Sequence, residues 1–226
     1  RSTDSDQDLA VDGATAPFAG HTITASNDAK HSSTVSVFGG SSMYFDGTGD
    51  YLTIPSSSDF NITDTFTIEA WLYHTGDSGE CYFSRAYAAS NQWILTVASN
   101  VLNMNYYDSS NSIDITVVSD AILSANSWNH CVVSRSSNVW QLFVNGIVGE
   151  TITNTTGAST TDVSTLFQHN VVIGASWRSV AHVPWTGYID EFRFSHGVSR
   201  YSKSIERFAN TFVAKGDTGD AFTAFQ

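Results

Sequence analysis

The stretch that decides the fold is Phe66-Thr67-Ile68-Glu69-Ala70-Trp71-Leu72-Tyr73, which is followed by Thr75-Gly76-Asp77. β-branched and aromatic residues fill this stretch and turn-forming residues end it, a pattern typical of a β-strand. A second stretch, from Trp128 to Arg135, has the same character. The chain contains no long run of apolar residues at the i, i+3, i+4, i+7 spacing of a helix. The local pattern therefore predicts strands.

Similar short segments recur along the whole chain, with Gly, Asn, Asp or Ser between them. They are Ser42–Phe45, Trp93–Val97, Val101–Tyr107, Ile113–Val118, Val139–Asn145, Val148–Thr153, Val171–Gly174 and Tyr188–Ser195. Asn145-Gly146 stands between two of them and predicts a tight hairpin, because a type I′ turn needs positive φ at both central residues. Many short strands at regular spacing predict an all-β fold, an antiparallel sandwich or barrel. No Pro- or Gly-rich linker divides the chain, so we expect one domain.

Composition limits the classes of function. The 226 residues are 41% hydrophobic and 13% aromatic, enough for one sizeable core. Only 14% are charged, against roughly 25% in an ordinary soluble domain, which favours an extracellular setting. The formal net charge of −12 argues against nucleic acid and anionic membranes as partners. No run approaches the roughly 18 apolar residues of a membrane span, so membrane insertion is not expected.

Five motifs resemble, in order, those of the laminin-G/pentraxin-like domains of the concanavalin A-like lectin/glucanase superfamily. They are Phe45-Asp46-Gly47 with Asp50-Tyr51-Leu52, Phe66–Trp71, Trp128–Arg135, Leu142–Gly146 and Gly187–Phe194. The next residues, Gly197–Tyr201, are similar in style to copies on tail and adhesion proteins of marine phages and bacteria. The resemblance implies a concanavalin A-like jelly roll, a two-sheet antiparallel β-sandwich, over residues 1–202. Residues 203–226 are then expected to be a C-terminal tail, as a short helix or linker.

The resemblance does not choose a reaction, because this superfamily includes lectins, adhesion modules, pentraxins and glycoside hydrolases. Glycoside hydrolysis needs two carboxylates that face one sugar. The hydrolases of the superfamily carry them on an E-x-D-x-E type strand, which this chain lacks. Glu69 stands alone in its segment, and Asp190 and Glu191 are adjacent, so a regular strand would point them to opposite faces. We therefore expect a protein that is not an enzyme.

Calcium is the cofactor that the sequence favours. A hard cation takes six to eight oxygen ligands, often from irregular loops. The turn from Asp46 to Asp50 offers two carboxylates and glycine carbonyls, and Asp190 is a candidate third ligand by its place in the family's last strand. The alternative is that Asp46 and Asp50 only make Asx turns, and that Asp190 caps a strand or pairs with Arg193.

A sugar site needs an exposed aromatic ring with polar groups around it. The loop before the last strand supplies Trp177, Arg178, His182 and Trp185, and Tyr107 is a further candidate. The alternative is that Trp185 fills the end of the core and that Trp177 covers a sheet edge.

Strand position predicts where three other tryptophans lie. Trp140 shares one parity with Leu142 and Val144, so we expect it in the core. Trp71 and Trp128 stand inside apolar segments, and we expect them there too.

These observations favour a noncatalytic, calcium-assisted carbohydrate-binding or adhesion domain of a larger secreted or virion-surface protein, with a glycan or polysaccharide as partner. The alternative is a structural or protein-interaction module of a virion or adhesin, which a closed oligomer with Trp177 buried between subunits would favour. A polysaccharide hydrolase or lyase with an unfamiliar carboxylate set is the third possibility. Cys81 and Cys131 can form a disulfide if their strands are neighbours, or can remain buried thiols.

Overall fold

The computed structural model describes residues 7–9, 21–60, 65–76, 79–87, 90–107, 113–137, 139–153, 169–176 and 183–201. In these ranges the chain forms fifteen β-strands and one 3₁₀ turn, η1, at Ser58–Phe60. Within the same residues, no helix has the length and apolar character to cross a membrane. The all-β class expected from the sequence is confirmed. The predicted C-terminal tail, residues 203–226, lies outside the described residues.

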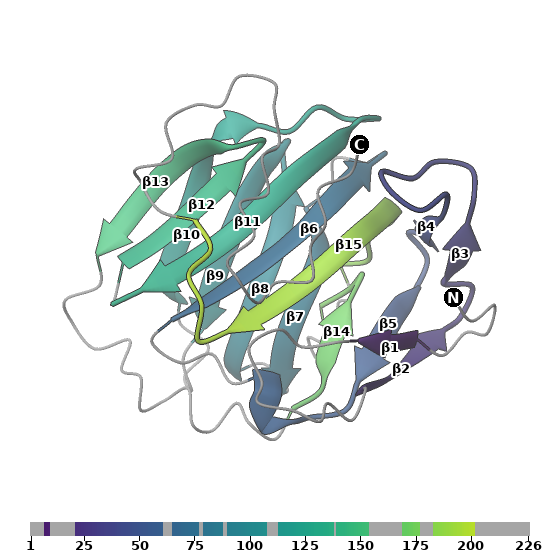
Figure 1. Ribbon diagram of the computed structural model, residues 1–226, viewed down its shortest axis with the longest axis horizontal. Coiled ribbons are helices and arrows are strands. Elements are labelled where there is room, and N and C mark those ends of the chain that lie inside the picture. The colour runs from purple at the N-terminus through teal and green to yellow at the C-terminus, as the bar shows by residue number, and fades with distance from the viewer. Residues whose placement is uncertain are drawn as a thin grey trace.

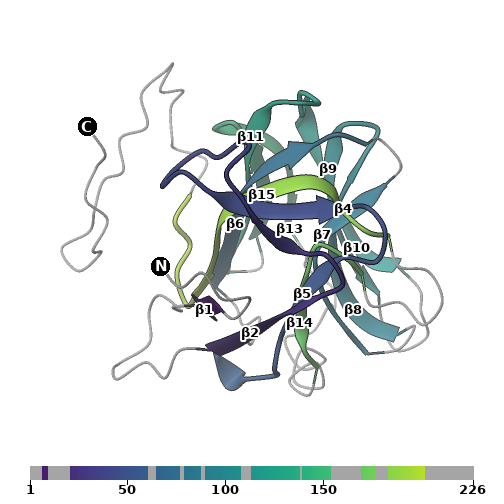
Figure 2. The ribbon, with the colours of Figure 1, turned by 90° about the vertical axis from the view of Figure 1, so that its right-hand side faces the viewer.

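The strands form two antiparallel sheets, stacked face to face (Figures 1 and 2). In spatial order, the eight-stranded sheet contains β1 (Gln7–Leu9), β2 (His21–Ser26), β5 (Tyr51–Ile54), β14 (Val171–Ile173), β7 (Glu80–Tyr87), β8 (Ser90–Ala98), β9 (Val101–Tyr107) and β10 (Ile113–Ile122). The seven-stranded sheet contains β13 (Ile147–Thr153), β12 (Val139–Val144), β11 (Trp128–Ser136), β6 (Phe66–His74), β15 (Thr186–His196), β4 (Ser42–Asp46) and β3 (Lys30–Ser32). The predicted two-sheet sandwich is confirmed.

The core lies between the sheets, and strand alternation selects the residues that enter it. On β6, Phe66, Ile68, Ala70 and Leu72 point inward and are buried in the core cluster. The intervening residues of β6 therefore lie on the outer face of the seven-stranded sheet.

One of the three tryptophan predictions is confirmed and two are wrong. Trp140 is buried in the core as expected. Trp71 has the outward parity of β6, and Trp128 shares the outer parity of β11, so both lie on the outer face and are partly exposed. The apolar neighbours of Trp71 and Trp128 suggested burial, but side-chain direction in a strand follows parity rather than local hydrophobicity.

Two turns have the backbone that their residues predict. Asn145 and Gly146 have φ of 51° and 77°, which confirms the type I′ hairpin between β12 and β13. The turn from Asp46 to Asp50 connects β4 in one sheet to β5 in the other, so it lies at an edge of the sandwich.

Candidate functional site

Four aromatic side chains form a row across the outer face of the seven-stranded sheet. This aromatic row consists of Trp128, Tyr73, Tyr188 and Tyr44, from the neighbouring strands β11, β6, β15 and β4. Successive ring centroids are 5.5, 5.6 and 5.0 Å apart. All four residues are partly exposed. The row crosses three inter-strand spacings, about 14 Å, which is long enough to contact more than one sugar ring.

Strand register produces the row. Tyr73 is directly opposite Trp128 on one side and Tyr188 on the other, and Tyr188 is opposite Tyr44. Each residue has the outward parity of its strand, so four positions from four parts of the chain meet in one line. Lys30, opposite Tyr44 on β3, places its ammonium nitrogen 5.8 Å from the centroid of that ring. A cation thus lies at one end of the row.

A second group of rings lies one step further along the strands. The Trp71 ring is 5.1 Å from that of His130 and 6.1 Å from that of Phe38. Trp71 and Phe38 are partly exposed, whereas His130 is buried. The aromatic surface is therefore more than one residue wide.

A short segment after β15, Gly197–Tyr201, crosses the rest of the outer face, and we call it the strap. In Figure 1 it leaves the end of β15 and passes over β11 and β12. The Thr67 hydroxyl donates to the Val198 carbonyl (2.9 Å) and accepts from the Arg200 amide (3.0 Å). The Ser199 and Ser134 hydroxyl oxygens are 2.8 Å apart. Outward hydroxyls of β6 and β11 thus hold the strap in place.

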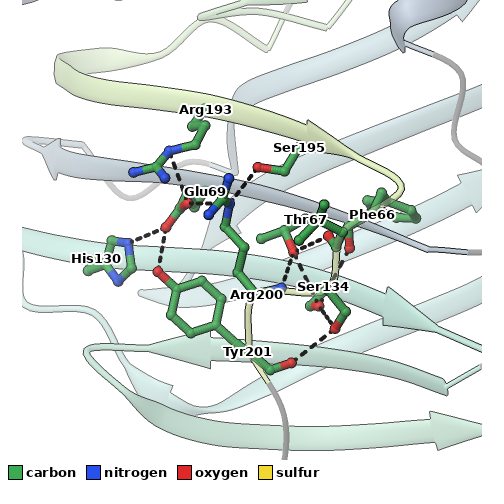
Figure 3. Close-up of polar contacts among 11 residues, drawn as sticks. Phe66, Thr67, Glu69, His130, Ser134, Arg193, Ser195, Arg200 and Tyr201 are labelled. Carbon is green, nitrogen blue, oxygen red and sulfur yellow. Dashed lines mark hydrogen bonds and ion pairs between the residues drawn. The ribbon is translucent and has the colours of Figure 1, made fainter. Parts of the chain in front are cut away.

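A charged cluster lies under the strap (Figure 3). Its centre is Glu69, an outward residue of β6 that is only 4% exposed. The carboxylate accepts a hydrogen bond of 2.6 Å from the Tyr201 hydroxyl, and His130 Nε2 lies 3.1 Å away. Arg193 Nε is 3.3 Å from the carboxylate and Arg200 Nε is 4.0 Å from it. Arg200 Nε also donates to the Ser195 hydroxyl at 2.7 Å.

The cluster keeps Glu69 ionised. Burial alone would raise the pKa of Glu69, but the hydrogen bond with His130, the charge of Arg193 and the hydrogen bond from Tyr201 outweigh it, so the net pKa is lowered. Burial, followed by the nearby Glu69 charge, raises the pKa of Tyr201. A general acid for glycoside cleavage needs a raised carboxyl pKa. Glu69 is thus suited to holding the strap and not to donating a proton.

The aspartates predicted to bind a metal ion accept hydrogen bonds from backbone amides of the chain. Asp50 is fully buried and accepts the amide protons of Asp28 (2.8 Å) and Asp46 (2.9 Å). Asp46 accepts the Thr48 amide proton at 2.6 Å, which is the Asx turn considered as the alternative. Both carboxylates organise the β4–β5 turn.

Asp190 does not join that turn. Asp46 is opposite Thr186 on β15, and Asp190 lies four residues further along that strand, about 13 Å away. Its Oδ2 accepts from the amides of Val37 and Phe38 (2.9 and 3.2 Å). Among the described residues, no three His, Cys, Asp or Glu side chains gather to hold a metal ion. The prediction that Asp46, Asp50 and Asp190 come together around one metal ion is therefore wrong.

The predicted sugar-binding loop is described only at its ends. Trp177, Arg178 and His182 lie outside the described residues, and so does the side chain of Tyr107. Trp185 is fully buried, 6.2 Å from the rings of both His74 and Tyr82. A buried ring has no face to offer a ligand, so its assignment to the binding set is corrected to the core.

The sequence contained one signal that could have found the aromatic row. Alternation along Phe66–Tyr73 gives Thr67, Glu69, Trp71 and Tyr73 a common face, and two of these are aromatic. The alignment of Tyr188, Tyr44 and Trp128 with Tyr73 depends on the order and register of four strands, which a single sequence does not contain.

Comparison with known proteins identifies the family and the fold. A family model described as concanavalin A-like lectin/glucanases superfamily matches residues 46–199, more than half of the chain. No curated protein matches the chain in sequence.

Three solved structures have similar folds. The botulinum neurotoxin serotype D binding domain has a TM-score of 0.57 and 10% identity; the match covers 78% of this chain but only 43% of that one. Domain 4 of an extracellular GH43 arabinanase from Geobacillus stearothermophilus, in complex with arabinotriose, has a TM-score of 0.56 and 14% identity, with 78% and 82% coverage. The Ruminococcus gnavus IT-sialidase CBM40, bound to α2,3 sialyllactose, has a TM-score of 0.51 and 15% identity, with 59% and 76% coverage. At these identities the likeness concerns the fold.

Proposed function

Because the chain belongs to the concanavalin A-like lectin/glucanases superfamily, we propose that it is a noncatalytic glycan-binding domain whose binding surface is the aromatic row. The observation that carries this proposal is the line of four partly exposed rings across four neighbouring strands. Sugars stack their C–H faces on such rings, and polar groups beside the rings set orientation. Two of the structurally similar domains were solved with an oligosaccharide bound, which supports the same class of ligand.

The row has the build of a rigid platform. Its side chains stand on strands in the middle of a sheet and not on a loop, so little ordering is needed when a ligand binds. Adjacent rings are tilted by 46° to 86° to one another, so the ring faces point in different directions along the row. Lys30 at one end can donate to a hydroxyl or to an acidic group of the sugar.

A glycan array followed by titration with the best glycan tests the proposal. We expect Tyr73→Ala and Trp128→Ala each to weaken binding by roughly tenfold, about 1.4 kcal/mol, because each removes one stacking surface. Tyr51→Ala is the matched control, since Tyr51 is a partly exposed tyrosine on the outer side of the other sheet. Equal affinity in all three variants, or no glycan bound by the folded protein, would contradict the proposal.

Calcium assistance is a separate prediction from the sequence, now limited to the β4–β5 turn. A ligand that binds only the folded protein at a hundredfold excess over Kd adds about 2.7 kcal/mol of stability. Calcium should then raise the melting temperature relative to chelator, and Asp46→Ala should abolish the difference. An identical melting temperature with calcium and with chelator removes calcium from the mechanism.

We also propose an extracellular or virion-surface setting within a larger secreted or adhesive protein. The support is the weakly charged, polar composition, with 14% charged residues. Fractionation of the native source that finds the protein only inside cells would contradict this setting.

A further inference from the structure

Arg85 is a cation inside the sandwich. It lies on β7, opposite Val171 of β14 and Trp93 of β8. Val171 and Trp93 both belong to the core cluster, so Arg85 shares the inward side of its sheet. The residue is 1% exposed. A buried guanidinium costs several kcal/mol unless hydrogen bonds and an opposite charge compensate it.

The described residues give this guanidinium one hydrogen bond, at a single nitrogen. Nη1 donates to the carbonyl of Phe60, the last residue of η1. Within the described residues, Nε and Nη2 find no hydrogen-bond partner. These two nitrogens direct their N–H bonds the same way, as a side-on fork that fits the two oxygens of a carboxylate. The nearest carboxylate along the chain from Phe60, Asp59, is 43% exposed and pairs instead with His21 at 2.9 Å.

The surroundings favour an anion. Trp93 stacks on Trp140 with centroids 4.9 Å apart, and the Trp140 indole N–H meets no acceptor in the part of the chain that the structure describes. A second buried arginine, Arg135, holds its guanidinium 4.8 Å from the Trp140 ring. Apolar walls around the Arg85 cation leave its attraction for a negative group weakly screened. Burial lowers the pKa of Arg85 to about 10, so the side chain is still charged at neutral pH.

We propose that the Nε and Nη2 edge of Arg85 binds the carboxylate of a small acidic ligand at this end of the sandwich. The site lies between the sheets and is separate from the aromatic row on the outer face, so it does not depend on the proposed function. Carboxylates occur on simple organic acids and on acidic sugars. The fork recognises the carboxylate that both classes share, and the test below distinguishes a simple organic acid from an acidic sugar.

Thermal melts of the full chain test the proposal, with sodium acetate, sodium glucuronate and sodium chloride at equal ionic strength. We expect a carboxylate to raise the melting temperature of the native protein by several degrees relative to chloride. Arg85→Lys should lose this shift, because lysine keeps the charge but lacks the fork. Arg135→Lys, the matched change at the other buried arginine, should keep it. A shift with glucuronate alone identifies an acidic sugar as the source, and equal shifts identify the carboxylate itself. No shift in the native protein, or the same shift in Arg85→Lys, overturns the proposal.

A spectroscopic measurement on the native protein decides the matter if Arg85→Lys fails to fold. In ¹⁵N spectra of the native protein, we expect acetate or glucuronate, but not chloride, to shift the Arg85 Nε–H resonance. An Arg85 Nε–H resonance that stays in place when acetate and glucuronate are added overturns an external ligand.

Discussion

Glu69 shows at the scale of single residues how an outward strand position becomes buried. The outer face of a sheet in a sandwich normally meets water. Here the strap covers the Glu69 carboxylate and leaves the residue 4% exposed. Partners from three elements compensate for the lost water: hydrogen bonds with His130 on β11 and Tyr201 on the strap, and an ion pair with Arg193 on β15. A covered carboxylate with these three partners links the strap to β11 and β15 at once.

Tyr201→Phe removes one hydrogen bond of this cluster and little else. We expect a loss of about 1.5–3 kcal/mol in the free energy of unfolding, the usual range for a hydrogen bond to a charged group. Urea denaturation of the native protein and the variant measures this loss. Tyr188→Phe is the control, because the Tyr188 hydroxyl makes no hydrogen bond to the described residues, and it should change stability by far less. Equal losses in both variants would mean that the bond to Glu69 contributes nothing specific.

The lowered pKa of Glu69 also sets a pH dependence. The folded protein binds the Glu69 proton more weakly than the unfolded chain, whose value is near 4.5. The stabilisation is therefore complete above the unfolded pKa and is lost as pH falls through the lower folded pKa. Melting temperatures between pH 7 and pH 3 should fall less steeply for Glu69→Gln than for the native protein. Parallel curves for the two proteins would contradict the lowered pKa.

At the scale of elements, two features of β15 shape the outer face: a break in its register with β6, and a point where its backbone passes close to β6. Asp190 is opposite Trp71 and Arg193 is opposite Glu69, so three steps on β15 match two on β6. This is a β-bulge, and Glu191 within it has φ of 48°. The extra residue changes parity and turns Arg193 outward, toward Glu69.

Gly187 on β15 lies close against the backbone of β6. Its φ is 134°, and a Cβ built there would lie 2.1 Å from the Tyr73 carbonyl oxygen. Gly187→Ala should therefore destabilise the protein by more than about 2 kcal/mol, since backbone must move and Tyr73 belongs to the aromatic row. Gly146→Ala is the control: its φ is also positive, but nothing lies within 4 Å, so a loss of about 1 kcal/mol is expected. Chemical denaturation of the two variants measures the difference, and similar losses would exclude the steric explanation.

At the scale of the whole molecule, the two sheets separate the two cysteines. Cys81 is on β7 of the eight-stranded sheet and Cys131 is on β11 of the seven-stranded sheet, and both are buried free thiols. Packed sheets lie about 10 Å apart, beyond the 7 Å limit between the Cα atoms of a disulfide. The question left open by the sequence is thus answered by the topology.

Burial of the two cysteines predicts how their thiols react. Burial raises the pKa of both, so neither reaches the thiolate form that reacts with a disulfide reagent. We expect no labelling of the folded protein and two labelled thiols per chain after unfolding in denaturant. The melting temperature should be the same with and without reducing agent. A drop in melting temperature on reduction would show that a disulfide forms.

The sequence by itself determined the strands, the hairpin at Asn145-Gly146 and the sandwich, because β-propensity, turn residues and alternation are local properties that repeat along the chain. Only the tertiary structure decided which sheet face each partly apolar strand presents to the outside. It moved Trp71 and Trp128 out of the core and Trp185 into it, and it separated Asp190 from Asp46. It also aligned Tyr44, Tyr188, Tyr73 and Trp128 and left one edge of Arg85 without a partner among the residues described. Except for the outward direction of Trp71, which alternation along β6 already indicates, these features depend on strand order, register and a one-residue bulge, which join positions far apart in the sequence.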